Sequence, residues 1–152
     1  MISELCKLSA REAVKRLKRG DVTPLELIDA AAKRISEVEP KVNALPTLCL
    51  DRAREEAKKL PARAKAAAEH PGWLAGLPVA IKDLSDVANV RTTYGSLHHA
   101  DDVPAEDAVA AARLKQAGAI LFGKTTTPEF GHKCLTDAPL FGRTRNAWTP
   151  PK

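Results

Sequence analysis

The chain has 152 residues, enough for one domain with a hydrophobic core. Hydrophobic residues make up 44% and charged residues 28%, a balance typical of globular rather than disordered proteins. Aromatic residues are only 4%, which argues against a base-stacking surface. The net charge of +5 is interspersed with acidic groups along helical stretches such as "DRAREEAKKL", so we expect no nucleic-acid partner.

The first predicted helix is "LSAREAVKRLKRG", residues 8–20. Ser9 and Glu12 have the spacing of a capping box, and Gly20 suits the left-handed position that closes a helix. These signals predict a short helix with both ends marked.

Two further helices follow. "DVTPLELIDAAAKRISEVEP" begins with Thr23 as the cap and is expected to end at Pro40. "CLDRAREEAKKL" is expected to end where Pro61 breaks it, before an alanine-rich helical piece. Both carry apolar stripes at helical spacing: Leu27, Ile28, Ala31, Ile35 and Val38 in one, and Leu50, Ala53, Ala57 and Leu60 in the other.

The pattern changes after residue 70. "PVAIK" and "AILF" are predicted strands, separated by a long polar loop and the helix "PAEDAVAAARLKQAG". Strand, helix and strand in this order predict a parallel pair with a right-handed crossover. The fold class is therefore α/β. We expect residues 1–152 to belong to one domain, with leading helices in 1–70 and the start of the α/β core in 71–152.

The other residues that could carry a site give little. Cys6, Cys49 and Cys134 form no CxxC pair, which predicts thiols in a reducing cytoplasm and no zinc site. No segment is apolar enough for a signal peptide or membrane span, so we expect a cytoplasmic protein with no membrane partner. The residues imply neither cofactor nor metal, and His98 and His99 in "HHADD" fit a polar loop rim.

Two catalytic motifs are weighed and rejected. "GAILFGKT", residues 118–125, matches the P-loop expression, but a helix precedes it and its middle residues are themselves a predicted strand. A serine–histidine site lacks support because Ser85 and Ser96 lie in a loop without a placed base and no GxSxG occurs.

Lys82 is the unusual residue, because it ends the apolar strand "PVAIK". A buried ammonium without a partner is costly, so such a lysine either extends its head to water or takes part in chemistry. The strand alone leaves both open. Lys82 as the nucleophile of a Schiff-base lyase is one chemical alternative.

Several separated blocks carry a resemblance. "GLPVAIKD", "TTYGS", "AARLKQAGAILFGKTTTPEFG" and "PLFGRTRNAW" resemble the N-terminal third of amidase-signature enzymes, and residues 8–45 are similar to that family's leading helices. The resemblance implies the first part of a large mixed β-sheet flanked by helices.

The resemblance also implies a mechanism in which a lysine, a serine with a cis peptide bond and a nucleophilic serine cleave a carboxamide C–N bond. Lys82 matches the family lysine, and burial would favour its neutral, proton-accepting amine. The family's "GGSSGG" segment, which follows "NAW", does not occur in this sequence, which instead reads "NAWTPPK". We therefore expect a fragment that holds only Lys82 and is inactive alone.

Two other functions stay open. One is the amidase-type component of a glutamyl-tRNA(Gln) or aspartyl-tRNA(Asn) amidotransferase, although "TTTPEFG" looks more like free-standing amidases. The other is a non-catalytic helical binding module built on residues 1–70. For the amidase, the expected partner is a small-molecule amide bound by the intact enzyme, and a homo-oligomer is compatible with the sequence.

Overall fold

The structure is a computed structural model that describes residues 2–67 and 70–148, without the side chains of 61–67. These residues form two compact units of interleaved segments. Unit 1 comprises 1–36, 49–79 and 113–122, and unit 2 comprises 37–48, 80–112 and 123–152. The division of one domain at residue 70 stays a prediction.

Helix α1, Ala10–Arg19, forms as its end signals predict. Ser9 Oγ accepts a hydrogen bond from the Glu12 backbone N–H at 3.2 Å, and Gly20 closes the helix with φ +77°. The Glu12 carboxylate pairs with Arg16 Nε at 3.2 Å. A short 3-10 helix, Glu4–Lys7, precedes α1.

Helix α2 runs from Pro24 to Val42, so the prediction that it ends at Pro40 is wrong. Its start is a closed capping box, in which Thr23 N–H donates to Glu26 Oε2 at 2.7 Å and Glu26 N–H donates to Thr23 Oγ1 at 3.2 Å. Proline removes a single N–H donor from the helix. The next turn still forms, because the Asn43 N–H donates to the Glu39 carbonyl at 2.9 Å.

Helix α3 extends from Leu50 to Ala67, which also passes the predicted break at Pro61. In unit 1, the apolar faces of the helices are buried in two clusters, as the stripes predict. The buried members of these clusters are Ala13, Leu17, Val22, Leu27, Leu60, Trp73 and Ala75 in one, and Ile28, Ala53, Ala57 and Ile120 in the other.

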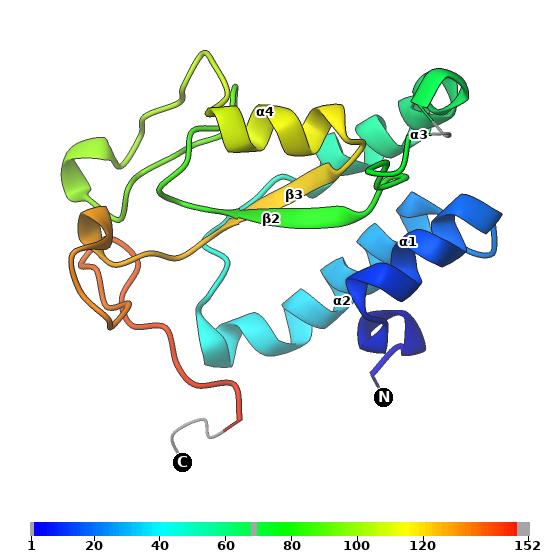
Figure 1. The fold of residues 1–152 in the computed structure, drawn as a ribbon. Helices are drawn as coiled ribbons and strands as arrows, with labels where there is room; N and C mark the ends of the chain where they lie inside the picture. The colour runs from blue at the N-terminus through cyan, green and yellow to red at the C-terminus, as the bar shows by residue number, and fades with distance from the viewer. Residues whose placement is uncertain (1, 68–69, 149–152) are drawn as a thin grey trace. The chain divides into compact units, whose positions relative to one another are not determined.

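A sheet of three strands, in the order β1-β3-β2, is formed by the described residues. The strands are β1 (Thr47–Leu48), β2 (Pro78–Lys82) and β3 (Ile120–Thr125). β2 and β3 lie side by side (Figure 1). They are parallel, because Ile120 N–H bonds the Leu77 carbonyl and Asp83 N–H bonds the Thr125 carbonyl, in the same order along both strands. This confirms the predicted βαβ unit.

The sheet differs from prediction in three respects. β1 was not predicted, and it pairs antiparallel with β3, Thr47 opposite Lys124. β3 runs on to Thr125, beyond the predicted "AILF". β2 is the edge strand of this sheet and its residues Pro78 to Ile81 are only half-buried, because the described residues place a neighbour on one side alone.

Helix α4, Val109–Gln116, is the crossover between β2 and β3 and starts five residues later than "PAEDA" suggests. The preceding segment is held by other bonds. Asp107 Oδ1 accepts from the Ala88 N–H at 2.8 Å, and the Ala108 N–H donates to the Asp86 carbonyl at 3.0 Å. The loop after β2 contains the 3-10 helix Leu97–His99, and another, Glu129–Gly131, follows β3. Among the described helices, none is both long and apolar enough to cross a membrane.

Candidate active site

Lys82, the predicted catalytic residue, is the last residue of β2, and its side chain is exposed. The expectation that it is buried is therefore not met in this structure. Across residues 2–67 and 70–148, its ammonium takes part in no hydrogen bond or ion pair. The cause is its place in the sheet: β2 is an edge strand, and alternation along the strand turns Lys82 away from the buried face on which Asp83 lies.

Asp83, the next residue, is fully buried and is held at four points. Its backbone N–H donates to the Thr125 carbonyl and its carbonyl accepts from the Tyr94 N–H, both at 3.0 Å. Its carboxylate oxygen Oδ2 accepts from the Thr93 N–H at 3.2 Å and from the Thr93 hydroxyl. The other oxygen, Oδ1, lies 3.1 Å from the ammonium of Lys124.

Lys124, in the middle of unit 2, is also fully buried. Its Nζ donates to the Thr92 hydroxyl at 2.6 Å and to the Ser85 carbonyl at 2.9 Å. The approach to Asp83 Oδ1 is close enough for an ion pair but is not aligned as a hydrogen bond, so Oδ1 is satisfied by charge rather than by a directed donor. Asp83, Lys124, Thr92 and Thr93 thus form a buried polar cluster, hereafter the Asp83–Lys124 cluster.

The loop after β2 is therefore not a solvated polar loop at its centre. Thr92, Thr93 and Ser96 are all fully buried. The Ser96 hydroxyl donates to Glu129 Oε1 at 2.7 Å, so this serine anchors the loop. Ser85 contributes its carbonyl to Lys124. These contacts agree with the rejection of a serine–histidine site.

Two left-handed turns meet beside this cluster. Tyr94 and Gly95 have φ +54° and +69°, and Phe130 and Gly131 have φ +49° and +72°. The Phe130 N–H donates to the Tyr94 carbonyl at 2.8 Å, and the two rings stack with centroids 6.3 Å apart. At Gly95 a Cβ would lie 2.8 Å from the Thr127 carbonyl oxygen, so the close approach of the two segments requires glycine there.

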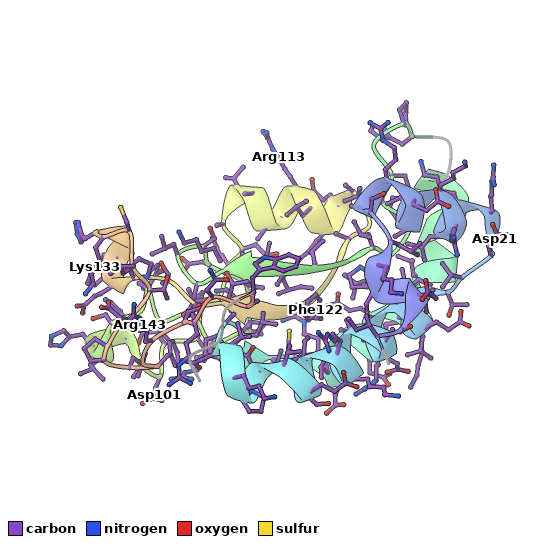
Figure 2. All side chains as sticks on the ribbon, turned by 90° about the horizontal axis from the view of Figure 1, so that it is seen from below. Asp21, Asp101, Arg113, Phe122, Lys133 and Arg143 are labelled. Atoms are coloured by element: carbon purple, nitrogen blue, oxygen red, sulfur yellow. The ribbon has the colours of Figure 1, made fainter. Side chains whose placement is uncertain are left out.

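The Tyr94 hydroxyl donates to Asp86 Oδ1. This hydrogen bond, and then partial burial, raises the pKa of Tyr94 to about 12, because both favour the neutral phenol. Tyr94 is therefore a hydrogen-bond donor across the physiological range. The neighbouring His99 packs edge-on against Tyr94 at 5.2 Å, and its Nδ1 lies 2.6 Å from Asp102 Oδ2. Side chains fill the space between these loops, as Figure 2 shows around Asp101 and Lys133.

The rejection of a P-loop is confirmed. Helix α4 precedes Gly118, and Ile120 to Thr125 are the strand β3. Gly118 closes the turn after α4 with φ +83°, packed against the ring of Trp73, rather than opening a phosphate loop.

Sequence reasoning missed Lys124. The signal was present, because Lys124 ends the apolar run "AILFG" in the way that Lys82 ends "PVAI". The argument that a lysine inside an apolar strand requires a partner applies to Lys124, which has one in Asp83. An ammonium paired with a carboxylate donates hydrogen bonds and has no lone pair to accept a proton, so Lys124 is suited to structure and Lys82 to chemistry.

The fold and the site together define an α/β protein whose exposed lysine lies at the carboxyl end of a parallel strand, a position at which α/β proteins commonly bind ligands. Comparison with sequence families is specific. The family profile named Amidase matches residues 26–152, and the chain belongs to the amidase family.

Curated relatives agree. The chain is 42% identical over 148 residues to the A-type subunit of the glutamyl-tRNA(Gln) amidotransferase of Roseiflexus sp. (strain RS-1), covering 97% of this chain and 29% of that protein. It is 36% identical over 141 residues to an acylamidase of Rhodococcus erythropolis, covering 93% of this chain and 29% of that protein. The chain thus spans less than a third of the length of these relatives.

Solved structures agree as well. A bacterial aryl acylamidase of the amidase signature family matches 94% of this chain and 30% of its own, with a TM-score of 0.81 and 28% identity. A vestigial complex related to an s-triazine catabolic enzyme matches 94% and 31%, with a TM-score of 0.84 and 30% identity. Fatty acid amide hydrolase, at 21% identity and a TM-score of 0.82, shares the fold.

Proposed function

We propose that this chain supplies Lys82 as the proton-accepting base of an enzyme that hydrolyses carboxamide C–N bonds. The observation that carries the proposal is the separation of two strand-end lysines. Lys124 is buried and ion-paired to Asp83, whereas Lys82 is exposed and adjacent to that same carboxylate. Because Lys124 engages Asp83, that carboxylate does not hold Lys82 in its charged form.

The proposed mechanism uses a serine pair that the family supplies. A neutral Lys82 amine takes the proton of the serine with a cis peptide bond, and that serine takes the proton of the nucleophilic serine. The activated oxygen attacks the amide carbon, the tetrahedral intermediate loses its amine with a returned proton, and water then hydrolyses the acyl-enzyme. Both serines would lie in the Gly/Ser-rich segment, which residues 1–152 do not contain. The chain alone is then inactive.

The substrate would be a small-molecule amide, and the protein would work in the cytoplasm. The relatives support amide chemistry through the acylamidase of Rhodococcus erythropolis. The homo-oligomer named above stays a prediction.

A second candidate is favoured by other relatives. The amidotransferase subunits from Roseiflexus and Carboxydothermus hydrogenoformans are 42% and 40% identical to the chain. In an amidotransferase the same lysine would release ammonia from an amide for transfer rather than into water. Ammonia transfer to a charged tRNA, absent without partner subunits, would distinguish this candidate from a free-standing amidase.

The experiment compares lysine variants of the complete enzyme that carries this sequence. Lys82→Met is expected to lower turnover of a simple aryl amide by about a thousandfold or more, because removal of a general base has effects of that order. The matched control is Lys133→Met, which removes an exposed lysine whose ion pair with Asp137 lies at the surface. Equal turnover of both variants would overturn the proposal and leave Lys82 as a solvent-exposed strand-end lysine.

A further inference from the structure

The Asp83–Lys124 pair lies in an unusual setting for an ion pair. Both side chains have 0% exposure, whereas the other ion pairs of the described residues join side chains that reach solvent. Removing two charges from water costs several kcal/mol per ion, and a well-packed apolar pair is often as stable. Stability alone is therefore a weak reason for this pair, and a role in fixing geometry is the alternative.

The geometry that the pair fixes is the carboxyl end of β2. Asp83 follows Lys82 directly, and its backbone N–H, its carbonyl and both carboxylate oxygens all have partners. The Lys82 carbonyl also accepts from the Ser85 N–H at 3.0 Å. The backbone on the C-terminal side of Lys82 is thus held from several directions, although its side chain is exposed.

The partners come from three separate segments of unit 2. Lys124 belongs to β3, Thr92 and Thr93 belong to the loop after β2, and Ser85 belongs to the turn next to Lys82. The ammonium of Lys124 bonds the Ser85 carbonyl and the Thr92 hydroxyl at once, so one charge ties that turn to the far part of the loop. A side chain that must meet a reacting group within about 0.5 Å needs a support of this kind.

We propose that the Asp83–Lys124 cluster is a positioning unit that fixes the direction in which Lys82 leaves β2. This inference rests on the proposed function of Lys82. Asp83 and Lys124 are not catalytic residues here, because they act through the backbone of Lys82 and reach no reacting atom. The cluster sets the orientation of the base, and so it affects turnover more than substrate binding.

The test uses the complete enzyme and the charge-neutral double variant Asp83→Asn/Lys124→Met. This variant leaves no unpaired buried charge and so retains the fold better than either single change. We expect kcat to fall by tenfold or more while KM changes by less than threefold. Ser96→Ala is the matched control, because it removes a buried hydroxyl bond of the same loop outside the cluster. Its kcat is expected to stay within twofold of the unaltered enzyme.

A double-mutant cycle with Lys82→Ala separates positioning from a merely structural effect. If the cluster acts through Lys82, the double variant causes no additional loss of residual turnover in the Lys82→Ala background. An equal tenfold loss in both backgrounds would overturn the inference, as would an unchanged kcat in the folded double variant. High activity of Lys82→Ala by itself would instead contradict the proposed function.

Thr93→Val provides a milder second variant where the double variant fails to fold. It removes the hydroxyl donor to Asp83 and keeps the Thr93 N–H bond to the same carboxylate oxygen. The expected result is a smaller fall in kcat, about threefold, again absent in the Lys82→Ala background. Unchanged kcat in folded Thr93→Val, with the double variant unfolded, would count against positioning and in favour of a purely structural cluster.

Discussion

The ammonium of Lys124 lies 3.1 Å from the carboxylate of Asp83, and both side chains are fully buried. Asp83 is adjacent to Lys82, which is exposed at the end of β2. Two lysines near the ends of neighbouring parallel strands therefore have opposite environments. One is held in a buried polar cluster, and the other is available to a reacting group.

The buried pair predicts an asymmetry in stability. Lys124→Met alone leaves the Asp83 carboxylate buried without its counter-ion, and we expect the free energy of unfolding to fall by about 3–5 kcal/mol. Asp83→Asn/Lys124→Met is expected to recover at least half of that loss. Urea unfolding of the two variants measures the difference. A double variant less stable than Lys124→Met would contradict the assignment of the pair as a buried ion pair.

The turn after α4 predicts a second effect. At Gly118, φ is +83° and a Cβ would lie 2.4 Å from the ring of Trp73. Gly118→Ala should therefore combine backbone strain with a clash, costing about 1–3 kcal/mol beyond the strain alone. Gly20→Ala is the matched control, because Gly20 has φ +77° but no atom within 4 Å of the added methyl group. Equal shifts in the urea midpoint of the two variants would show that the contact with Trp73 is absent.

Tyr94 predicts a pH dependence at the alkaline end. Its pKa is raised to about 12, chiefly by its hydrogen bond to Asp86, whereas an unfolded tyrosine titrates near 10. The folded protein then binds more protons than the unfolded one between these values. The stability contributed by the neutral phenol is fully present below pH 10 and is lost as pH rises toward 12.

Tyr94 is the one tyrosine of the 152 residues, so tyrosinate absorbance reports on it alone. We expect the titration of this chain to have its midpoint well above pH 10, and Asp86→Asn to move the midpoint back toward 10. A midpoint near 10 in the unaltered chain would show that the Tyr94–Asp86 bond does not form in solution.

The purified 152-residue chain is expected to release no amine from simple aryl amides above background. The reason is chemical: the proposed mechanism needs a nucleophilic serine and a second serine that these residues do not supply, and removal of a nucleophile leaves little catalysis. Product release measured by chromatography checks this expectation. Turnover by the chain that disappears in Lys82→Ala would mean that a nucleophile lies within residues 1–152.

Local signals predicted the helices and the parallel strand pair, because capping residues and apolar spacing act over a few positions. Helix α1 forms from Ser9 to Gly20 as its caps indicate. The predicted ends at Pro40 and Pro61 were wrong, since losing one backbone donor did not stop either helix. Strand β1 has only two residues, too few for a pattern to show.

The site was only partly predictable for a related reason. Lys82 could be selected from its strand and from the family resemblance. The partners of Asp83 come from residues 10 to 41 positions away, and no short motif links Thr93 and Lys124 to it. Their contacts depend on how the loop after β2 folds back on β3, which is a tertiary property.

The central claim is that Lys82 acts as a base, and rescue of Lys82→Ala by an added alkylamine tests it most directly. In the complete enzyme, we expect Lys82→Ala to lose at least about a thousandfold in turnover. Ethylamine should then restore part of the activity, in proportion to the concentration of its neutral form. Turnover of Lys82→Ala that stays within a few-fold of the unaltered enzyme, without added amine, would contradict the account.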